Sequence, residues 1–141
     1  MNKSENVRTV RRLFACFGQG DITGAVDLLS DDVEWQVAGR PEIIPWAGTH
    51  LGREQVAWFF TILAETVELQ ALELRDVITQ GDTVVVLGHE QSRVKPTDRT
   101  CASDWAMVFT LRDGQIARFQ EYHDTDGWAA AYGAPAAEGH G

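Results

Sequence analysis

The sequence predicts an α+β fold, a cone-shaped domain in which three N-terminal helices pack on a curved, mostly antiparallel sheet that encloses a cavity. Apolar residues recur with helical spacing in the first half of the chain, and strand-like segments separated by turn residues follow from Leu69 onward. The length of 141 residues fits one domain with room for a pocket. We therefore expect a single domain over 1–141, with a core over about 5–132 and a flexible tail over 134–141.

Three segments of the N-terminal half have the pattern of helices. The first carries an apolar stripe typical of an amphipathic helix, formed by Val7, Val10, Phe14 and Phe17. It should end near the glycines of 18–20, after which Asp21 can cap a second, shorter helix over 22–29. The third is predicted over roughly 53–66, from the spacing of Val56, Phe59, Phe60 and Leu63.

The strands are predicted from alternation and turn residues. A short strand over 33–37 precedes a Pro- and Gly-bearing loop over 39–52, and an antiparallel meander follows over 69–79, 83–94, 100–111 and 115–123. In the last strand Arg118 and Gln120 mark the solvent face, so Phe119, Glu121 and His123 should face inward. Because a buried charge is costly unless it is paired, the inward Glu and His are either a satisfied structural contact or the acid–base groups of a cavity.

The turns set the register of the meander. If 112–114 is a three-residue loop, Leu111 pairs with Gln115 and Trp105 falls opposite Glu121. If 96–99 is a four-residue loop, Glu90 falls opposite Trp105 on its other side. We therefore expect Glu90, Trp105 and Glu121 to form one row, with the two Glu backbones roughly 10 Å apart. A one-residue slip would turn Glu90 outward and bring His89 in.

Composition excludes several classes of protein. The formal charge of −9 and the pI near 4.7 argue against a surface that binds phosphates, so nucleic acid is not an expected partner. The longest apolar run, 56–64, is half the length of a membrane span, and 1–6 lacks the apolar segment of a signal peptide. We expect a cytoplasmic protein with no membrane contact. Cys16 and Cys101 form no Cys-x-x-Cys motif and are interpreted as reduced core thiols.

Four motifs together resemble a known family. They are Asp31-Asp32-Val33-Glu34-Trp35, Trp46-Ala47-Gly48-Thr49-His50-Leu51-Gly52-Arg53-Glu54, Leu111-Arg112-Asp113-Gly114-Gln115-Ile116 and Glu121-Tyr122-His123-Asp124-Thr125. The chain resembles, over about residues 5–132, the SnoaL-like branch of the nuclear-transport-factor-2-like (NTF2-like) superfamily. That superfamily includes ketosteroid isomerase, polyketide cyclases, limonene epoxide hydrolase, dehydratases and noncatalytic binding modules, so the resemblance specifies the fold better than the activity. It also implies a homodimer through the outer face of the sheet.

Two enzymes of the superfamily show what this chain keeps and lacks. The closing motif of limonene epoxide hydrolase aligns with 119–124, which places Glu121 and, by counting back, Glu90 at its two catalytic acids. Its Arg, Tyr and Asn, which hold the attacking water, correspond to Gly88, Trp35 and Val37. Ketosteroid isomerase uses a Tyr on the first helix, where this chain has Phe14 and Phe17. The resemblance therefore implies two acids without the partner groups of either enzyme.

These observations predict a mostly apolar pocket with a few convergent polar groups. The expected walls are Trp35, Trp46, Phe59, Trp105 and Phe119, and the expected polar groups are Glu90, Glu121, His123 and Ser103. Such a pocket suits a small apolar molecule with a carbonyl group.

Our hypothesis is an enzyme that abstracts a proton alpha to that carbonyl, leading to isomerisation, cyclisation or dehydration. Glu121 would be the base, His123 its partner acid or an electrostatic stabiliser, and Glu90 a second acid. No cofactor or metal is expected, since no motif such as His-Glu-x-x-His is present. The alternatives are a noncatalytic binding module with the same cavity, an epoxide hydrolase-like enzyme, and a Glu–His pair that is only structural.

Overall fold

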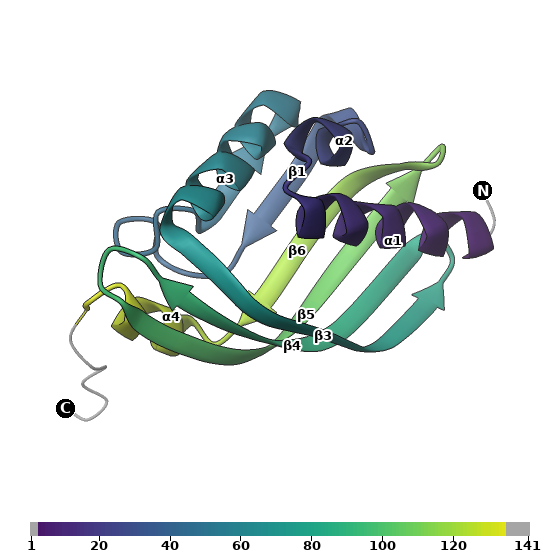
Figure 1. Cartoon of the computed structure of the whole chain (residues 1–141). Helices are drawn as coiled ribbons and strands as arrows, with labels where there is room; N and C mark the ends of the chain where they lie inside the picture. The colour runs from purple at the N-terminus through teal and green to yellow at the C-terminus, as the bar shows by residue number, and fades with distance from the viewer. Residues whose placement is uncertain (1–2, 135–141) are drawn as a thin grey trace.

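The computed structural model describes residues 3–134, in which four helices lie against one six-stranded sheet (Figure 1). The tail predicted over 134–141 falls outside the described residues except for residue 134. The elements are α1 (Lys3–Gln19), α2 (Ile22–Val26), β1 (Leu29–Val37), β2 (Gly48–Leu51), α3 (Gly52–Thr66), β3 (Val67–Gln80), β4 (Thr83–Val94), β5 (Arg99–Arg112), β6 (Gln115–His123) and α4 (Thr125–Ala131). This is the predicted α+β architecture.

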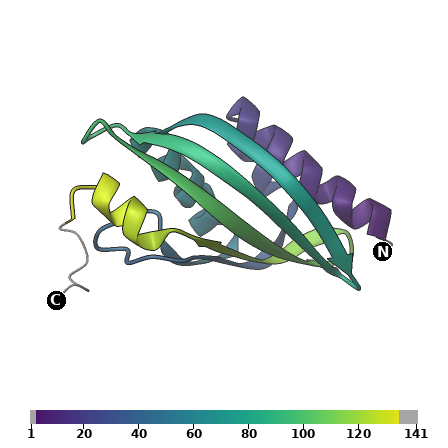
Figure 2. The ribbon, with the colours of Figure 1, turned by 90° about the horizontal axis from the view of Figure 1, so that it is seen from below.

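The sheet has the order β2-β1-β6-β5-β4-β3, and its strands are antiparallel except for the parallel pair β1 and β6. Helices α1, α2 and α3 cover its concave face, and α4 lies at the end of the sheet away from the N-terminus (Figures 1 and 2). The inward residues of β1, β5 and β6 alternate with outward ones and pack against the helices, as period-two burial requires. Among the described residues, no helix has the length and apolar character needed to cross a membrane.

The three predicted helices are present, although their ends differ from the prediction. Helix α1 buries Val10, which belongs to the predicted stripe, and Leu13, which precedes the stripe residue Phe14. Asp21 caps α2 as expected, since its carboxylate accepts from the Gly24 amide at 2.9 Å. That helix ends at Val26, because β1 begins at Leu29 and is longer than the strand predicted over 33–37.

Two short elements were not predicted from the sequence. Strand β2 lies in the segment predicted as a loop and pairs antiparallel with β1, joining Trp35 to His50. Helix α4 follows β6 and is capped by Asp124, which accepts from the Gly127 amide at 2.9 Å. Four and seven residues are too few to show a clear period, so neither could be distinguished from a loop by alternation.

The register predicted for β5 and β6 is wrong. Arg112 pairs with Gln115 across a two-residue turn, in which Asp113 and Gly114 both have positive φ, and a bulge follows between Thr110 and Leu111. Glu121 therefore lies opposite Met107, not opposite Trp105. The total displacement is two residues, so the inward and outward faces are unchanged.

The register predicted for β4 and β5 is also wrong. The turn covers 95–98, Val94 pairs with Arg99, and Glu90 lies opposite Ser103. Trp105 instead faces Gly88 on one side and His123 on the other. The expected row of Glu90, Trp105 and Glu121 is therefore absent. The shift is again even, so Glu90 faces inward and His89 lies outside, with its Nδ1 2.8 Å from Asp104 Oδ1.

Candidate active site

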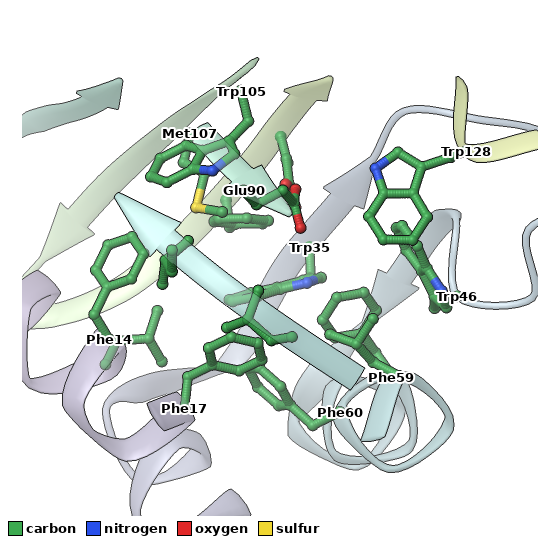
Figure 3. Close-up of a pocket in the computed structure, with 16 residues that line it drawn as sticks. Phe14, Phe17, Trp35, Trp46, Phe59, Phe60, Glu90, Trp105, Met107 and Trp128 are labelled. Carbon is green, nitrogen blue, oxygen red and sulfur yellow. The ribbon is translucent and has the colours of Figure 1, made fainter. Parts of the chain in front are cut away.

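A cavity lies between the helices and the concave face of the sheet, and its wall is mostly aromatic (Figure 3). It offers about 80 Å³ to the centres of water-sized molecules. All five side chains that the sequence predicts as walls line it: Trp35, Trp46, Phe59, Trp105 and Phe119. The prediction omitted several others, among them Phe14, Phe17, Phe60, Met107 and Trp128. The polar side chains with ionisable groups on this wall are Glu90 and Glu121.

The aromatic wall is held by contacts between rings. Trp35 stacks on Phe119, with ring centroids 3.8 Å apart, because β1 and β6 are neighbours and these two residues are paired in register. Trp46 meets Trp128 edge to face at 4.9 Å, so the loop before α3 and the C-terminal helix close the same end of the cavity. These side chains are at most 3% exposed, so they are packed within the core.

Glu90 and Glu121 of the cavity wall come together with His123. One side-chain atom of each, a carboxylate oxygen or a ring nitrogen, lies within 4.8 Å of the others. Glu90 comes from β4, whereas Glu121 and His123 come from β6, so the predicted constellation forms despite the wrong register. Glu90 also accepts a hydrogen bond from the Ser92 hydroxyl at 3.3 Å.

Burial controls the ionisation of both acids. It raises the pKa of Glu90 to about 7, against the hydrogen bond from Ser92, which lowers it. Burial also raises the pKa of Glu121 well above the usual value, and the charge of Glu90 raises it further. Both carboxyl groups therefore hold their protons to a higher pH than exposed carboxyl groups do, and their titrations are linked.

His123 is a neutral acceptor in this arrangement. Burial lowers its pKa, against the hydrogen bond with Ala38, which raises it. Its Nε2 lies 2.6 Å from the Ala38 carbonyl oxygen, and since a carbonyl only accepts, Nε2 carries the hydrogen. Nδ1 is then an acceptor, and it is buried without a hydrogen-bond partner among the described residues. The ring is also packed against Trp46 and Trp128, at centroid distances of 5.6 and 6.2 Å.

Ser103 does not contribute to the cavity wall, contrary to the prediction. Its hydroxyl donates to the Asp104 carbonyl oxygen at 2.7 Å and accepts from the Asp124 amide at 3.0 Å. Asp124 is the N-cap of α4, so Ser103 fixes the start of the helix that carries Trp128. The inward direction of Ser103 was predicted correctly, but its hydroxyl forms hydrogen bonds with backbone groups.

The positions that correspond to the water-holding groups of limonene epoxide hydrolase are filled by packing. A Cβ at Gly88 would collide with the ring of Trp105 and with the Glu73 carbonyl oxygen, so a larger side chain has no space there. Trp35 and Val37 are buried in the core. The structure therefore gives no support to the epoxide hydrolase-like alternative.

A hydrogen-bonded chain behind the wall was not predicted. The Trp46 indole N–H donates to the Tyr132 hydroxyl at 2.8 Å, and that hydroxyl lies 2.7 Å from the Thr66 hydroxyl. Thr66 in turn donates to the Ile62 carbonyl oxygen. These contacts join the loop before α3, the end of α3 and the segment after α4. The available signal was the hydroxyl of Tyr132, since a buried Tyr usually needs a polar partner.

The same three groups are those that could share a cation. Two carboxylates and one imidazole offer oxygen and nitrogen ligands of the kind that divalent transition metals accept. Their separation alone does not distinguish a cation from a shared proton. The expectation of no metal stays a prediction.

A family model for the SnoaL-like domain matches residues 10–119. The chain belongs to this family. Among solved structures, an NTF2-like protein from Burkholderia xenovorans LB400 is 36% identical, with a TM-score of 0.86 over 94% of this chain and 98% of that one. The NTF2-like fold predicted from the sequence motifs is thereby confirmed. A search of the curated proteins found no match.

Two further structures of this fold hold small molecules. TerC, co-crystallised with polyporic acid, is 26% identical, with a TM-score of 0.78 over 92% of this chain and 99% of that one. A protein with a ketosteroid isomerase-like fold from Catenulispora acidiphila DSM 44928, in complex with trimethylamine, is 19% identical, with a TM-score of 0.74 over 90% of this chain and 93% of that one. The second likeness shows the fold alone.

Proposed function

We propose that this SnoaL-like protein is a cofactor-independent enzyme that moves a proton on a small, apolar, carbonyl-bearing substrate. The outcome would be isomerisation, cyclisation or dehydration. One observation carries the proposal: a half-buried and a buried carboxyl group, both in the wall of an aromatic cavity, and a neutral imidazole lie within 4.8 Å of one another. Desolvation gives the two acids different proton affinities, which is the condition for one to accept and the other to donate a proton.

The roles of the two acids are reversed relative to the sequence hypothesis. With a pKa of about 7, Glu90 is partly ionised at neutral pH and is the base. Its carboxylate takes a proton from the carbon alpha to the carbonyl, the C–H electron pair forms a C=C bond, and the carbonyl oxygen becomes an enolate. Glu121, which holds its proton, is the acid for that oxygen. When Glu90 returns its proton to another carbon of a conjugated enol, the O–H proton goes back to Glu121, the carbonyl is restored, and the isomerisation ends with no net change in protons.

His123 is the positioning residue of this pair. Because Nε2 donates to Ala38, the imidazole is fixed as the tautomer whose Nδ1 accepts. His123 Nδ1 can accept a hydrogen bond from a neutral carboxyl group, but it has no proton to donate to the enolate oxygen. The sequence hypothesis of His123 as the partner acid is therefore less well supported than its role as an acceptor.

The reaction can be tested without knowing the product. We expect the wild type to accelerate exchange of the alpha hydrogens of an enolisable ketone, such as 1-tetralone, in deuterated buffer, as followed by proton NMR. Glu90→Gln removes the base and should lower the exchange rate by about 10² to 10⁴. Glu121→Gln should also lower it, because an amide cannot transfer the proton.

The matched control for these variants is Glu34→Gln, which changes an exposed Glu on β1 and should leave exchange unchanged. Equal rates for Glu90→Gln, Glu34→Gln and the wild type across a panel of ketones would overturn the proposal. A loss with Glu121→Gln but not with Glu90→Gln would restore Glu121 as the base.

A noncatalytic binding module is the second candidate. It is favoured by the wall itself, in which aromatic side chains predominate. Two structures of the same fold hold small molecules, polyporic acid and trimethylamine, so the fold accepts such ligands. The exchange experiment separates the candidates, because a binding module would bind ketones with no acceleration in any variant.

We also infer that the protein is a cytoplasmic homodimer that pairs through the outer face of the sheet. Leu87, Ala106 and Tyr122 form one cross-strand row on that face. Tyr122 is 50% exposed, and the other two are half-buried. Val85 and Val108 form the next row, so the apolar surface is continuous across β4 and β5.

A further inference from the structure

Three tryptophan N–H groups of the cavity wall have no hydrogen-bond partner. Trp35, Trp105 and Trp128 are 2%, 3% and 1% exposed, all three line the cavity, and their indole nitrogens are buried and unpaired among the described residues. Trp46 differs, because its N–H donates to Tyr132. In the view of Figure 3 the nitrogens of the three unpaired indoles lie on the sides of their rings that face Glu90.

Unpaired donors in such a position need an explanation. Buried polar groups are paired in the great majority of cases, and a buried indole N–H usually has an acceptor. The other side chains of the wall are apolar apart from Glu90 and Glu121, so the wall supplies no further acceptor oxygen. The three indoles are bonded neither to these two acids nor to the unpaired His123 Nδ1, so a molecule in the cavity is a source of acceptors for them.

The donors come from three separate elements. Trp35 lies on β1, Trp105 on β5 and Trp128 on α4. A molecule between them is approached by N–H groups from the sheet and from the closing helix. This arrangement suits a flat ligand with oxygen atoms on more than one edge. The chain has no Tyr on the first helix to bind a carbonyl oxygen, and the indole N–H groups could bind it instead.

We propose that the indole N–H groups of Trp35, Trp105 and Trp128 bind the oxygen atoms of an uncharged ketone or quinone of one or two rings. The size follows from the cavity: at about 10 to 15 Å³ for each water centre, 80 Å³ corresponds to roughly five to eight waters. The lack of charge follows from the wall, in which no Lys or Arg is present to bind an anion beside Glu90.

This inference deepens the proposed function and rests on it for the claim that the bound carbonyl reacts. Neutral donors aimed at a carbonyl oxygen become more effective as negative charge develops on it. The three indoles would thus hold the substrate carbonyl and favour the enolate, while Glu90 takes the proton. The binding claim itself requires only that the N–H groups meet an oxygen acceptor.

The test compares two probes that differ in one oxygen, 1-tetralone and its hydrocarbon tetralin. The chain has five Trp residues, so protein with ¹⁵N in its indoles gives five indole N–H signals. With 1-tetralone, at least one of the signals of Trp35, Trp105 and Trp128 should move downfield relative to the tetralin complex. Those of Trp46, already paired, and Trp58, 52% exposed, should not differ between probes.

Affinity gives a second readout that does not depend on turnover. The wild type should bind 1-tetralone about fivefold or more tightly than tetralin, as expected for one hydrogen bond to a buried donor. Trp105→Phe should reduce that preference. Trp46→Phe is the matched control, since it removes the same volume from the wall but no unpaired donor, and it should keep the preference.

Two results would overturn the inference: equal affinities for the two probes, or indole signals that are the same with both. Since these measurements use the wild type, they stand even if a Trp variant fails to fold. Failure of the proposed function is distinguishable, because it would leave the indole shifts in place while ketone exchange stays unaccelerated in the wild type.

Discussion

Glu90 and Glu121 approach each other diagonally across a row of the sheet. Between them, Gly88, Trp105 and His123 are cross-strand partners on β4, β5 and β6. Because Gly88 has no side chain, the ring of Trp105 lies against the Gly88 backbone. The side chains in the middle of this row therefore project little into the cavity. The carboxyl groups reach over this row from opposite sides, on a sheet whose concave face converges its side chains. A glycine is therefore what allows two acids on non-adjacent strands to share a site.

The raised pKa of Glu90 predicts a stability that depends on pH. The folded state holds the Glu90 proton up to about pH 7, whereas the unfolded chain releases it near 4.5. The free energy of unfolding should therefore fall as pH rises from 4.5 to 7, by roughly 3 kcal/mol at about 1.4 kcal/mol for each unit of pKa. Denaturant unfolding at pH 5 and pH 8 checks this.

Glu90→Gln should flatten this dependence, and the difference between wild type and variant isolates the effect of Glu90. The comparison is needed because His123 acts in the opposite direction. Its lowered pKa removes stability as pH falls through about 6.5. If the wild type and Glu90→Gln show parallel profiles, Glu90 is not buried as an acid.

Gly88→Ala should be destabilising by about 1 to 3 kcal/mol, a typical cost of overpacking a core. The new methyl group would collide with the Trp105 ring and with the Glu73 carbonyl oxygen. Trp105 would have to move, so 1-tetralone binding should weaken as well. The matched control is Gly18→Ala, where a Cβ meets no atom within 4 Å. Thermal unfolding of both variants measures the difference, and equal melting temperatures would show that the ring can yield.

At the scale of elements, periodicity decided what the sequence could predict. The long helices and the four strands of the meander have enough residues for a recognisable period, and the inward faces predicted for 100–111 and 115–123 were correct. Strand β2 and helix α4 were not predicted, because four and seven residues define no period. The register failed for a different reason: loops of two, three or four residues are all compatible with Arg112-Asp113-Gly114 and Lys95-Pro96-Thr97-Asp98-Arg99.

Tyr132→Phe tests how α4 is attached. The hydroxyl that joins Trp46 to Thr66 would be lost, leaving the buried Trp46 N–H without an acceptor. We expect a loss of about 1 to 3 kcal/mol in the free energy of unfolding. Tyr122→Phe is the matched control, as Tyr122 is 50% exposed and the chain has two Tyr residues. Denaturant unfolding of both variants checks this, and equal losses would show that the Tyr132 hydroxyl contributes no specific stabilisation.

At the scale of the whole molecule, the sheet separates two functions on its two faces. The concave face carries the acids and the aromatic wall, and the outer face carries the apolar rows proposed for dimerisation. Most of the candidate site was predictable, because inward direction follows from alternation alone. The contacts were not, since the hydroxyl of Ser103, the partner of His123 and the unpaired indoles depend on elements far apart in the sequence.

The dimer proposal predicts a mass of about twice 15.6 kDa in light scattering. Tyr122→Lys places a charge in the apolar row of the outer face and should shift the equilibrium to monomers. Trp58→Lys, which changes an exposed aromatic residue on α3, should not. A monomeric wild type would contradict the proposal without affecting the active-site assignment.

The position of the closing helix has a consequence for biosynthesis. Phe14 and Phe17 of the cavity wall lie on α1, which is made before the other elements described, whereas Trp128 of α4 and Tyr132 just after it are among the last described residues to be made. A nascent chain that lacks them has an aromatic surface open at one end, and exposed apolar surface of this kind promotes aggregation. The cavity is therefore completed only after β6 has been made, when the emerging α4 covers it.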